Sequence, residues 1–342
     1  MSEFACSVAS LLPGAGIAVR DGTCLAVEGW LTRPDLPPNL AESELPACLL
    51  DLFLLEGPGF VEALRGSFQI AIHSCRDGGE TWLLADPVAS RRLFYRPLAT
   101  GGLAFAPEVA PLAGLERAAV DPANLLQFLI AGRFFAGESL LDGVRLLLPG
   151  EALHYRAGQL RRHFYYRYEA GPEREGDVAA LTRELERVLD RAVLSAFERA
   201  KDPVFLLSGG YDSRYLFHTV ARSMADPGSL RTALFGQRMD LPGSDNAIAR
   251  AVARRFGVKH LELPWRSELL PEQFSEMFAA QSGMTELIFT HSDELAVFGA
   301  LAEEHGFGSV LRGDECFGPR GGEVLSSDQA LGRVAMARAL QV

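Results

Sequence analysis

The residues with the clearest chemical potential lie together at 205–213, where the sequence reads FLLSGGYDS. Two adjacent glycines let the backbone turn tightly and bring its N–H groups close to a ligand. Those N–H groups, the hydroxyls of Ser208 and Ser213 and the N-terminus of a following helix would form a nest of donors for phosphate oxygens. Asp212 would repel phosphate unless a cation lay between them, so the segment predicts a bound Mg²⁺. The alternative is a plain strand-to-helix turn in which the glycines supply only geometry.

The segments around this loop alternate between strands and helices. We expect strands at 204–207, 230–235, 258–263 and 309–311, and helices at 177–200, 213–224, 245–256 and 295–305. Such alternation predicts an α/β domain with a parallel sheet covered by helices on both faces. The polar residues 170–176, rich in Gly and Pro, predict a linker in front of this half.

The front half instead reads as short strands separated by turn residues. Residues 66–73 alternate side chains as a half-buried strand does. Further strands are expected at 24–27, 81–85, 93–96, 102–106, 151–154 and 159–166, and helices at 44–55 and 122–130. Asp121 is a candidate N-cap for the second helix, and Pro122 suits its first position. We therefore expect two domains, at 1–169 and 177–342.

Composition and charge exclude several classes of protein. The chain has 342 residues, 48% hydrophobic and 23% charged, as in ordinary globular proteins. A net charge of −11 argues against a broad nucleic-acid-binding face and against attraction to an anionic membrane. No apolar run approaches the roughly 20 residues of a membrane-spanning helix, and the opening residues do not read as a signal peptide. The five cysteines are scattered, which predicts free thiols in a reducing cytoplasm.

The loop at 208–213 resembles the PP-loop of the ATP pyrophosphatases, whose signature is Ser-Gly-Gly-x-Asp-Ser. Three further segments narrow the resemblance to the asparagine synthetase family: 232–236, 244–260 and 310–318 are similar to its adenine-lining strand, its next helix and strand, and its acidic loop. The resemblance implies a doubly wound, adenine nucleotide α-hydrolase-like domain that uses ATP and Mg²⁺. It also implies AMP-forming chemistry, in which a substrate carboxylate attacks the α-phosphorus of ATP and an amine then displaces AMP.

Carried over position by position, the resemblance assigns roles to residues of this chain. Pyrophosphate would be held by Ser208, Gly209, Gly210, Asp212 and Ser213, and the adenosine would lie against Leu206, Leu234, Arg312 and Gly313. Asp212 and Asp314 would hold Mg²⁺, and Asp212 and Glu315 would be the catalytic residues. The acidic loop is shorter than is usual, so Asp314 and Glu315 both remain candidates for the metal position, and a solvated acidic turn is the alternative. Arg214 replaces the serine usual after Asp-Ser and adds a cation that could reach a phosphate.

The front half resembles class II glutamine amidotransferase domains, which implies an αββα sandwich of the Ntn type. Three features of that family are missing: Ser2 stands where it exposes a cysteine, Glu28-Gly29 where it has Asn-Gly, and 86–89 read Asp-Pro-Val-Ala. A hydroxyl is a weaker nucleophile than a thiolate, and a carboxylate opposes a developing negative charge. We therefore expect no glutaminase activity. The arrangement is similar to β-lactam synthetases and lasso-peptide cyclases, natural-product enzymes in which the substrate carries the amine.

Three functional hypotheses remain. The first is an ATP-dependent, AMP-forming amide ligase acting on a small-molecule or peptide carboxylate. The second is a non-catalytic nucleotide-binding or scaffolding subunit that needs a partner chain, because the family continues in helices beyond the acidic loop whereas this chain ends 24 residues after Gly318. A second protein would then supply those helices. The third is a glutamine-hydrolysing asparagine synthetase.

Overall fold

The chain folds into two compact units. The structure is a computed structural model that describes residues 16–34, 36, 40–115, 118–169, 171–172, 176–236, 242–284 and 294–313. One unit comprises Met1–Pro172 and Gln273–Ser292, and the other comprises Glu173–Glu272 and Asp293–Val342. Each unit has its own sheets and its own apolar core.

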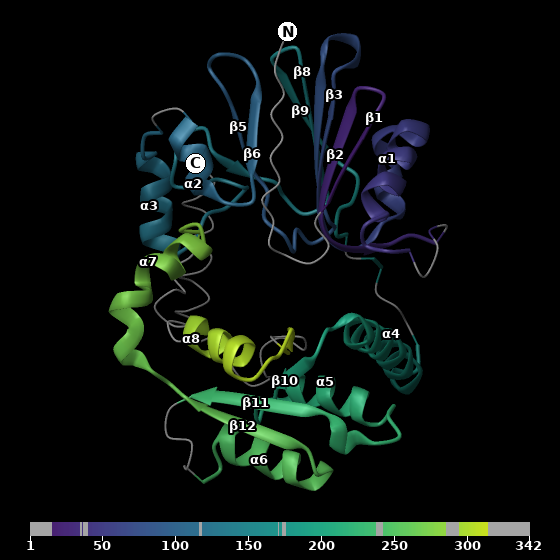
Figure 1. Ribbon diagram of the computed structural model, residues 1–342, viewed down its shortest axis with the longest axis vertical. Helices are drawn as coiled ribbons and strands as arrows, with labels where there is room; N and C mark the ends of the chain where they lie inside the picture. The colour runs from purple at the N-terminus through teal and green to yellow at the C-terminus, as the bar shows by residue number, and fades with distance from the viewer. Residues whose placement is uncertain are drawn as a thin grey trace. The chain divides into compact units, whose positions relative to one another are not determined.

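The first unit contains two antiparallel sheets (Figure 1). The larger has the strand order β1-β2-β3-β4-β8-β9, formed by β1 (Gly16–Arg20), β2 (Thr23–Thr32), β3 (Arg65–Ser74), β4 (Glu80–Ala85), β8 (Glu151–Arg156) and β9 (Gln159–Phe164). The smaller has the order β6-β5-β7, formed by β5 (Phe94–Pro97), β6 (Leu103–Ala106) and β7 (Arg145–Leu146). The helices are α1 (Leu45–Glu56), α2 (Val109–Leu115) and α3 (Pro122–Ala131), with 3₁₀ turns η1 (Gly57–Ala63) and η2 (Arg76–Gly78).

The two sheets and their helices form four layers, and the side chains of each strand alternate between the clusters on its two faces. Ile70 and Ile72 of β3 pack in the cluster that contains α1, whereas Ala71 between them packs against the cluster between the two sheets. In the smaller sheet, Tyr95 faces that same inter-sheet cluster and its neighbour Phe94 packs with α2. Successive side chains of a strand point to opposite faces, so each sheet separates two cores. The expected αββα sandwich is confirmed.

The segment after α7 (Leu270–Ala280) is fastened to this first unit. Arg92 donates from its two terminal nitrogens to the carbonyl oxygens of Ala280 (2.5 Å) and Gln281 (2.7 Å). A cation suits the partial negative charge at the C-terminus of a helix. Met284 packs beside the cluster of Phe94, so a piece of the second half of the sequence completes the front unit.

The second unit is a parallel sheet with the strand order β12-β11-β10-β13. Its strands are β10 (Pro203–Leu206), β11 (Arg231–Gly236), β12 (Lys259–Pro264) and β13 (Ser309–Leu311). The helical elements are α4 (Val178–Arg199), α5 (Tyr211–Ala221), η3 (Pro227–Ser229), α6 (Asp245–Phe256), η4 (Ser267–Leu269), α8 (Glu294–Gly299) and a π-helical turn, η6 (Ala300–Glu304). Phe205 packs with α4, α5 and α6, whereas Leu206 packs with α8 and η6. Helices therefore cover both faces, and the expected doubly wound parallel sheet is confirmed.

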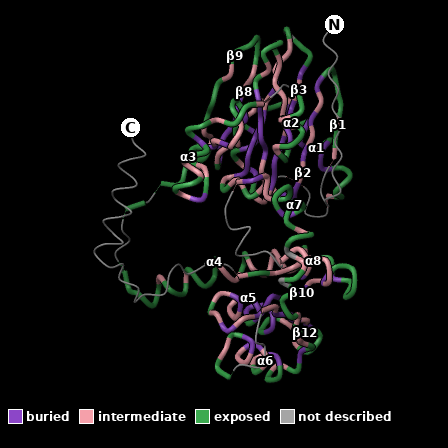
Figure 2. Tube along the Cα trace, turned by 90° about the vertical axis from the view of Figure 1, so that its left-hand side faces the viewer, coloured by how far each residue is buried: buried purple, intermediate pink, exposed green. Residues whose placement is uncertain are grey.

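Helix ends follow the sequence signals. Asp121 caps α3 by accepting hydrogen bonds from the N–H groups of Ala123 and Asn124, at 2.8 and 3.1 Å. Ser244 caps α6, and Gly257 ends that helix with φ of 67°, a conformation that costs glycine little. No residue of α4 is buried, as its pink and green trace in Figure 2 shows. Within the described ranges, no helix combines the length and apolarity needed to cross a bilayer.

Candidate functional site

The strand order of the second unit reverses between β10 and β13. After β10 the chain passes through α5 to β11 and then through α6 to β12, and both helices pack on one face of the sheet. It then passes through α8, on the opposite face, and reaches β13, which pairs with the other edge of β10. In open α/β sheets, ligands bind outside the carboxyl ends of the strands at such a switch point. The two segments that meet there are the loop at 207–210, which follows β10, and Arg312-Gly313, which follow β13.

The loop is held in shape by its own serines. The hydroxyls of Ser208 and Ser213 share a hydrogen bond of 2.9 Å, and the Ser213 hydroxyl also accepts from the Ser208 N–H at 3.0 Å. The Ser208 hydroxyl accepts from the N–H of Gly210 at 3.1 Å. Ser213 is only 5% exposed. Both hydroxyls therefore shape the loop, and the contact of Ser208 and Ser213 with pyrophosphate remains a prediction.

The donors that remain open are the first amides of α5. Its N-cap residue is Gly210, which has no side chain to cap the helix. The first amide with an intrahelical partner is that of Arg214, which donates to the carbonyl of Gly210. The N–H groups at 211–213 therefore lack a partner within the helix, and the positive end of the helix dipole adds to their attraction for an anion.

Two glycines let three segments converge on this loop. A Cβ on Gly209 would lie 2.4 Å from Oδ1 of Asp245, at the start of α6. A Cβ on Gly313 would lie 2.7 Å from the carbonyl carbon of Asp212 and 2.8 Å from the backbone nitrogen of Ser213. At Gly313 the obstacle is backbone, so that position requires glycine by contact. At Gly209 the nearest atom is a carboxylate oxygen that can rotate away, and Cα of Asp245 would be next at 3.0 Å. The structure thus brings together Ser208, Gly209, Gly210, Asp212, Ser213 and Gly313.

Charged groups of both signs surround the loop. The side chain of Asp212 is half-buried, and that of Asp245 is exposed. Arg214 turns back toward the N-terminus of α5: its Nε donates to the carbonyl of Gly210 at 3.1 Å, and its guanidinium carbon lies 4.8 Å from the centre of the Tyr211 ring. Asp245 was not predicted as a site residue; its closeness to Gly209 is the signal that identifies it. The carboxylate of Asp212 is a hard oxygen ligand that fits Mg²⁺.

The residues expected around adenosine are not gathered in one place. Leu206 pairs in register with Ala233, so Leu234 points to the opposite face of the sheet and packs with α4, α5 and α6. Arg312 donates from NH1 to Oε1 of Glu294 at 2.7 Å. Asp314 and Glu315 lie outside the described residues, so their place beside Asp212 remains a prediction. In the described part of the chain, no three His, Cys, Asp or Glu side chains gather as a metal site.

The front unit holds an ion pair at Glu28, where the resemblance to class II amidotransferases implies an oxyanion-binding Asn-Gly. Glu28 accepts from NH1 of Arg91 at 3.0 Å and from Nε2 of Gln69 at 2.6 Å. The neighbouring Gly29 has φ of 115°, and a Cβ there would lie 2.0 Å from the carbonyl oxygen of Ser67. The carboxylate therefore has its own cation among the described residues. Arg91 was not predicted as a partner of Glu28, and Ser2 lies outside the described residues.

Comparison with protein families finds one match in each half of the chain. Residues 44–166 match the glutamine amidotransferase domain family, and residues 184–330 match the asparagine synthase family. The comparison with curated proteins found no match.

Two solved structures are similar to this chain at low identity and low TM-score. The first is a glutamine phosphoribosylpyrophosphate amidotransferase from B. subtilis complexed with ADP and GMP; it is 12% identical, with 77% of this chain and 50% of that chain covered and a TM-score of 0.28. The second is described as the allosteric regulatory enzyme of purine biosynthesis; it is 12% identical, with 71% and 45% covered and a TM-score of 0.27. This chain spans about half the length of the two solved structures.

Proposed function

We propose, from the premise that this chain belongs to the asparagine synthetase-like family of ATP-dependent amide-bond-forming ligases, that it activates a carboxylate as an acyl-adenylate and transfers the acyl group to an amine. The observation that carries the proposal is the loop at 208–213. It lies at the switch point of a parallel sheet, its helix begins without a side-chain cap, and Gly313 from the adjacent strand end packs against it. These are the features of a site for a phosphate chain.

The chemistry proceeds in two balanced steps. An oxygen of the substrate carboxylate forms a bond to the α-phosphorus of ATP while the bond from that phosphorus to the β-phosphate oxygen breaks, and pyrophosphate leaves. The amine nitrogen then bonds to the acyl carbon, the acyl–oxygen bond to AMP breaks, and the nitrogen loses a proton. The amides at 211 and 212, which lack a partner within the helix, would stabilise the charge that builds on the leaving pyrophosphate, because donors aimed at developing charge lower the barrier.

The acidic and basic side chains at the loop would have different roles, the carboxylates toward Mg²⁺ and Arg214 toward the phosphates. Asp212 would hold Mg²⁺, and the ion would supply charge neutralisation to the phosphates. Asp314 would share the ion and Glu315 would face the reacting groups, as the family resemblance implies. Arg214 is held beside the first turn by Gly210 and Tyr211, and its remaining nitrogens would meet the pyrophosphate. A guanidinium suits phosphate because its donors are planar and fixed.

The amine is proposed to come from the substrate and not from glutamine. Support comes from Glu28, which pairs with Arg91 at the position where the resemblance implies donors for an oxyanion; a carboxylate there would oppose the developing negative charge. A purified protein that releases glutamate from glutamine would contradict this part of the proposal.

The test is the exchange of labelled pyrophosphate into ATP in the presence of Mg²⁺ and candidate carboxylic acids. We expect exchange that depends on the acid and is lost in Asp212→Ala, while Glu303→Ala, at an exposed position of η6, keeps it. Binding of Mg-ATP without exchange for any acid would support the second hypothesis, a nucleotide-binding subunit that needs a partner. Absence of Mg-ATP binding by calorimetry would overturn both.

A further inference from the structure

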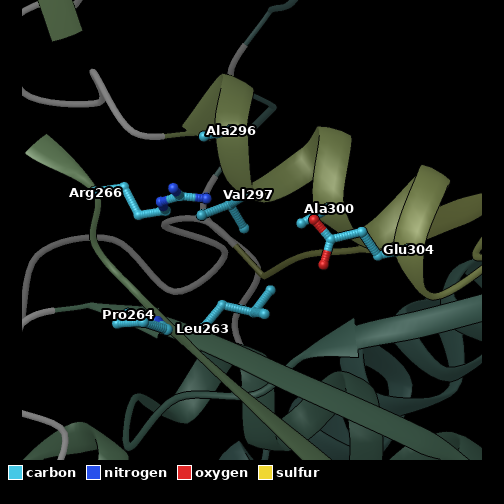
Figure 3. A pocket seen from close by; sticks show the side chains of 7 residues that line it. All are labelled: Leu263, Pro264, Arg266, Ala296, Val297, Ala300 and Glu304. Carbon is cyan, nitrogen blue, oxygen red and sulfur yellow. The ribbon is translucent and has the colours of Figure 1, made fainter. Parts of the chain in front are cut away.

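The unit that carries the loop has a pocket that the proposed function does not use. It has a volume of about 320 Å³ and lies between the end of β12 and the helical segment α8–η6 (Figure 3). Leu263 and Pro264 line it from the strand, and Ala296, Val297 and Ala300 from the helix. The carboxyl end of a parallel strand is where α/β sheets bind ligands, and β12 is separated from the loop strand β10 by β11.

The helical wall of the pocket is built from small residues. Ala296, Ala300 and Glu304 recur every fourth position and so share one side of the helix. The two alanines leave the space open, and Leu263 and Val297 provide an apolar floor that continues into the core of this face. The wall changes from α-helical to π-helical at Ala300. Single π-turns inside helices occur frequently at functional sites.

Opposite charges stand at the two ends of this apolar space. Figure 3 shows the guanidinium of Arg266 entering from one end and the carboxylate of Glu304 from the other, with Val297 and Leu263 between them. Within the described residues, Arg266 has one long bond, from Nε to Oε1 of Glu268 at 3.5 Å, and both of these side chains are well exposed. In the same part of the chain, Glu304 has no ion-pair partner. Neither head group is therefore held by a close partner among these residues.

The geometry points to a binding site for a zwitterion whose amine and carboxylate are separated by an apolar body. The carboxylate would pair with Arg266, the ammonium group with Glu304, and the body would cover Leu263 and Val297. A short apolar peptide and an ω-amino acid share this chemistry. A free α-amino acid does not, because both of its charges sit on one carbon. The inference does not rest on the proposed ligase function, since neither ATP nor the loop takes part.

The test is titration calorimetry of the full chain without nucleotide, with Leu-Leu, 6-aminohexanoate and leucine as probes. We expect one of the first two to bind at least tenfold more tightly than leucine, and the tighter one identifies the source of the ligand. N-acetylation of that probe, or amidation of its carboxylate, should weaken binding about two- to fivefold, the scale of an exposed ion pair. The fluorescence of Trp265, which lies between Pro264 and Arg266, gives a second readout in a Trp30→Phe, Trp82→Phe background.

Variants separate the pocket from non-specific binding. Ala300→Leu fills the space and should reduce the affinity more than tenfold, whereas Ala302→Leu, at an exposed position of the same turn, should leave it unchanged. Arg266→Gln should remove the preference for a free carboxylate, and Glu304→Gln should remove the preference for a free amine. These two substitutions are at the surface, so they test the inference even if Ala300→Leu does not fold. Equal binding of free and blocked probes, equal binding of leucine, or no binding of any probe would overturn the inference. None of these outcomes depends on pyrophosphate exchange.

Discussion

Gly313 lies against Asp212 so closely that a Cβ on the glycine would come within 2.7 Å of the carbonyl carbon of the aspartate. The two residues follow different strands, β13 and β10, which are parallel neighbours. Their contact joins the end of one strand to the phosphate loop of the other. Because the obstacle is backbone, a side chain at 313 must displace the loop itself.

We therefore expect Gly313→Ala to weaken the binding of Mg-ATP by at least tenfold while the protein stays folded. The loop would have to move by several tenths of an ångström, and its amides at 211–213 would lose their alignment. Calorimetry with Mg-ATP and a circular dichroism melt give the two readouts. Gly299→Ala is the matched control, because a Cβ at Gly299 meets nothing within 4 Å. Unchanged nucleotide affinity in Gly313→Ala would show that the contact has no part in the site.

Arg214→Ser restores the residue that the family usually has after Asp-Ser, and we expect it to weaken the binding of pyrophosphate. A hydrogen bond to a charged group contributes about 1.5–3 kcal/mol, so the loss should be on the order of 10- to 100-fold. Arg214→Lys keeps the charge but loses the planar donors and the bond from Nε to Gly210, so it should fall between the two. Calorimetry with Mg-pyrophosphate measures all three proteins. Equal affinities would place Arg214 outside the phosphate site.

Most of the elements could be predicted from periodicity and turn residues. The helix Asp245–Phe256 has the bounds expected for it, because Ser244 and Gly257 mark its ends. The strand β1 and the helix α7 were not predicted. Arg92 bonds to the last turn of α7 and is 188 residues away from Ala280 in the sequence. A contact between such distant residues has no local sequence signal from which the end of the helix could be predicted.

In the candidate site, too, features within one short motif could be predicted, and contacts between distant segments could not. The six loop and strand-end residues that the structure brings together were predicted, because the glycines and serines form one short motif. Two contacts could not be predicted, because each joins segments that are distant in the sequence: Asp245 with Gly209, and Glu28 with Arg91. Leu206 and Leu234 were expected on one ligand, but register places Leu206 opposite Ala233, which puts the two leucines on opposite faces. Their role at the adenosine remains a prediction.

His260 should make the second unit sensitive to mild acid. Burial lowers the pKa of His260, with the charge of Arg250 acting in the same direction and that of Glu262 opposing it. Its Nδ1 bonds to Oγ1 of Thr232 at 2.9 Å, and its buried Nε2 has no partner among the described residues. The unfolded chain, in which histidine titrates near about 6.5, therefore binds the proton more readily. Stability is retained above that pH and is lost as the pH falls toward the lowered pKa.

The measurement is urea unfolding followed by Trp265 fluorescence between pH 7 and pH 5. We expect His260→Gln to reduce the fall in unfolding free energy over this range by about 1 kcal/mol. His305→Gln serves as the control, because that histidine is exposed. An identical pH dependence in wild type and His260→Gln would mean that another group governs the acid sensitivity.

The Glu28–Arg91 pair should stabilise the front unit. The two side chains are 14% and 23% exposed, so they are shielded from water more than a surface pair is. Removing one partner of such a pair leaves the other poorly solvated, and we expect Glu28→Ala or Arg91→Ala to cost about 2 kcal/mol each, below the 3–5 kcal/mol of a fully buried pair. The double variant should cost less than the sum of the two single variants, because neither charge is then left alone.

Unfolding followed by the fluorescence of Trp30 and Trp82 in a Trp265→Phe background measures this double-mutant cycle. The exposed pair Arg76–Asp21, at 3.6 Å, is the matched control and should show a coupling below about 1 kcal/mol. Additive costs at Glu28 and Arg91 would mean that the pair fills the position without stabilising it.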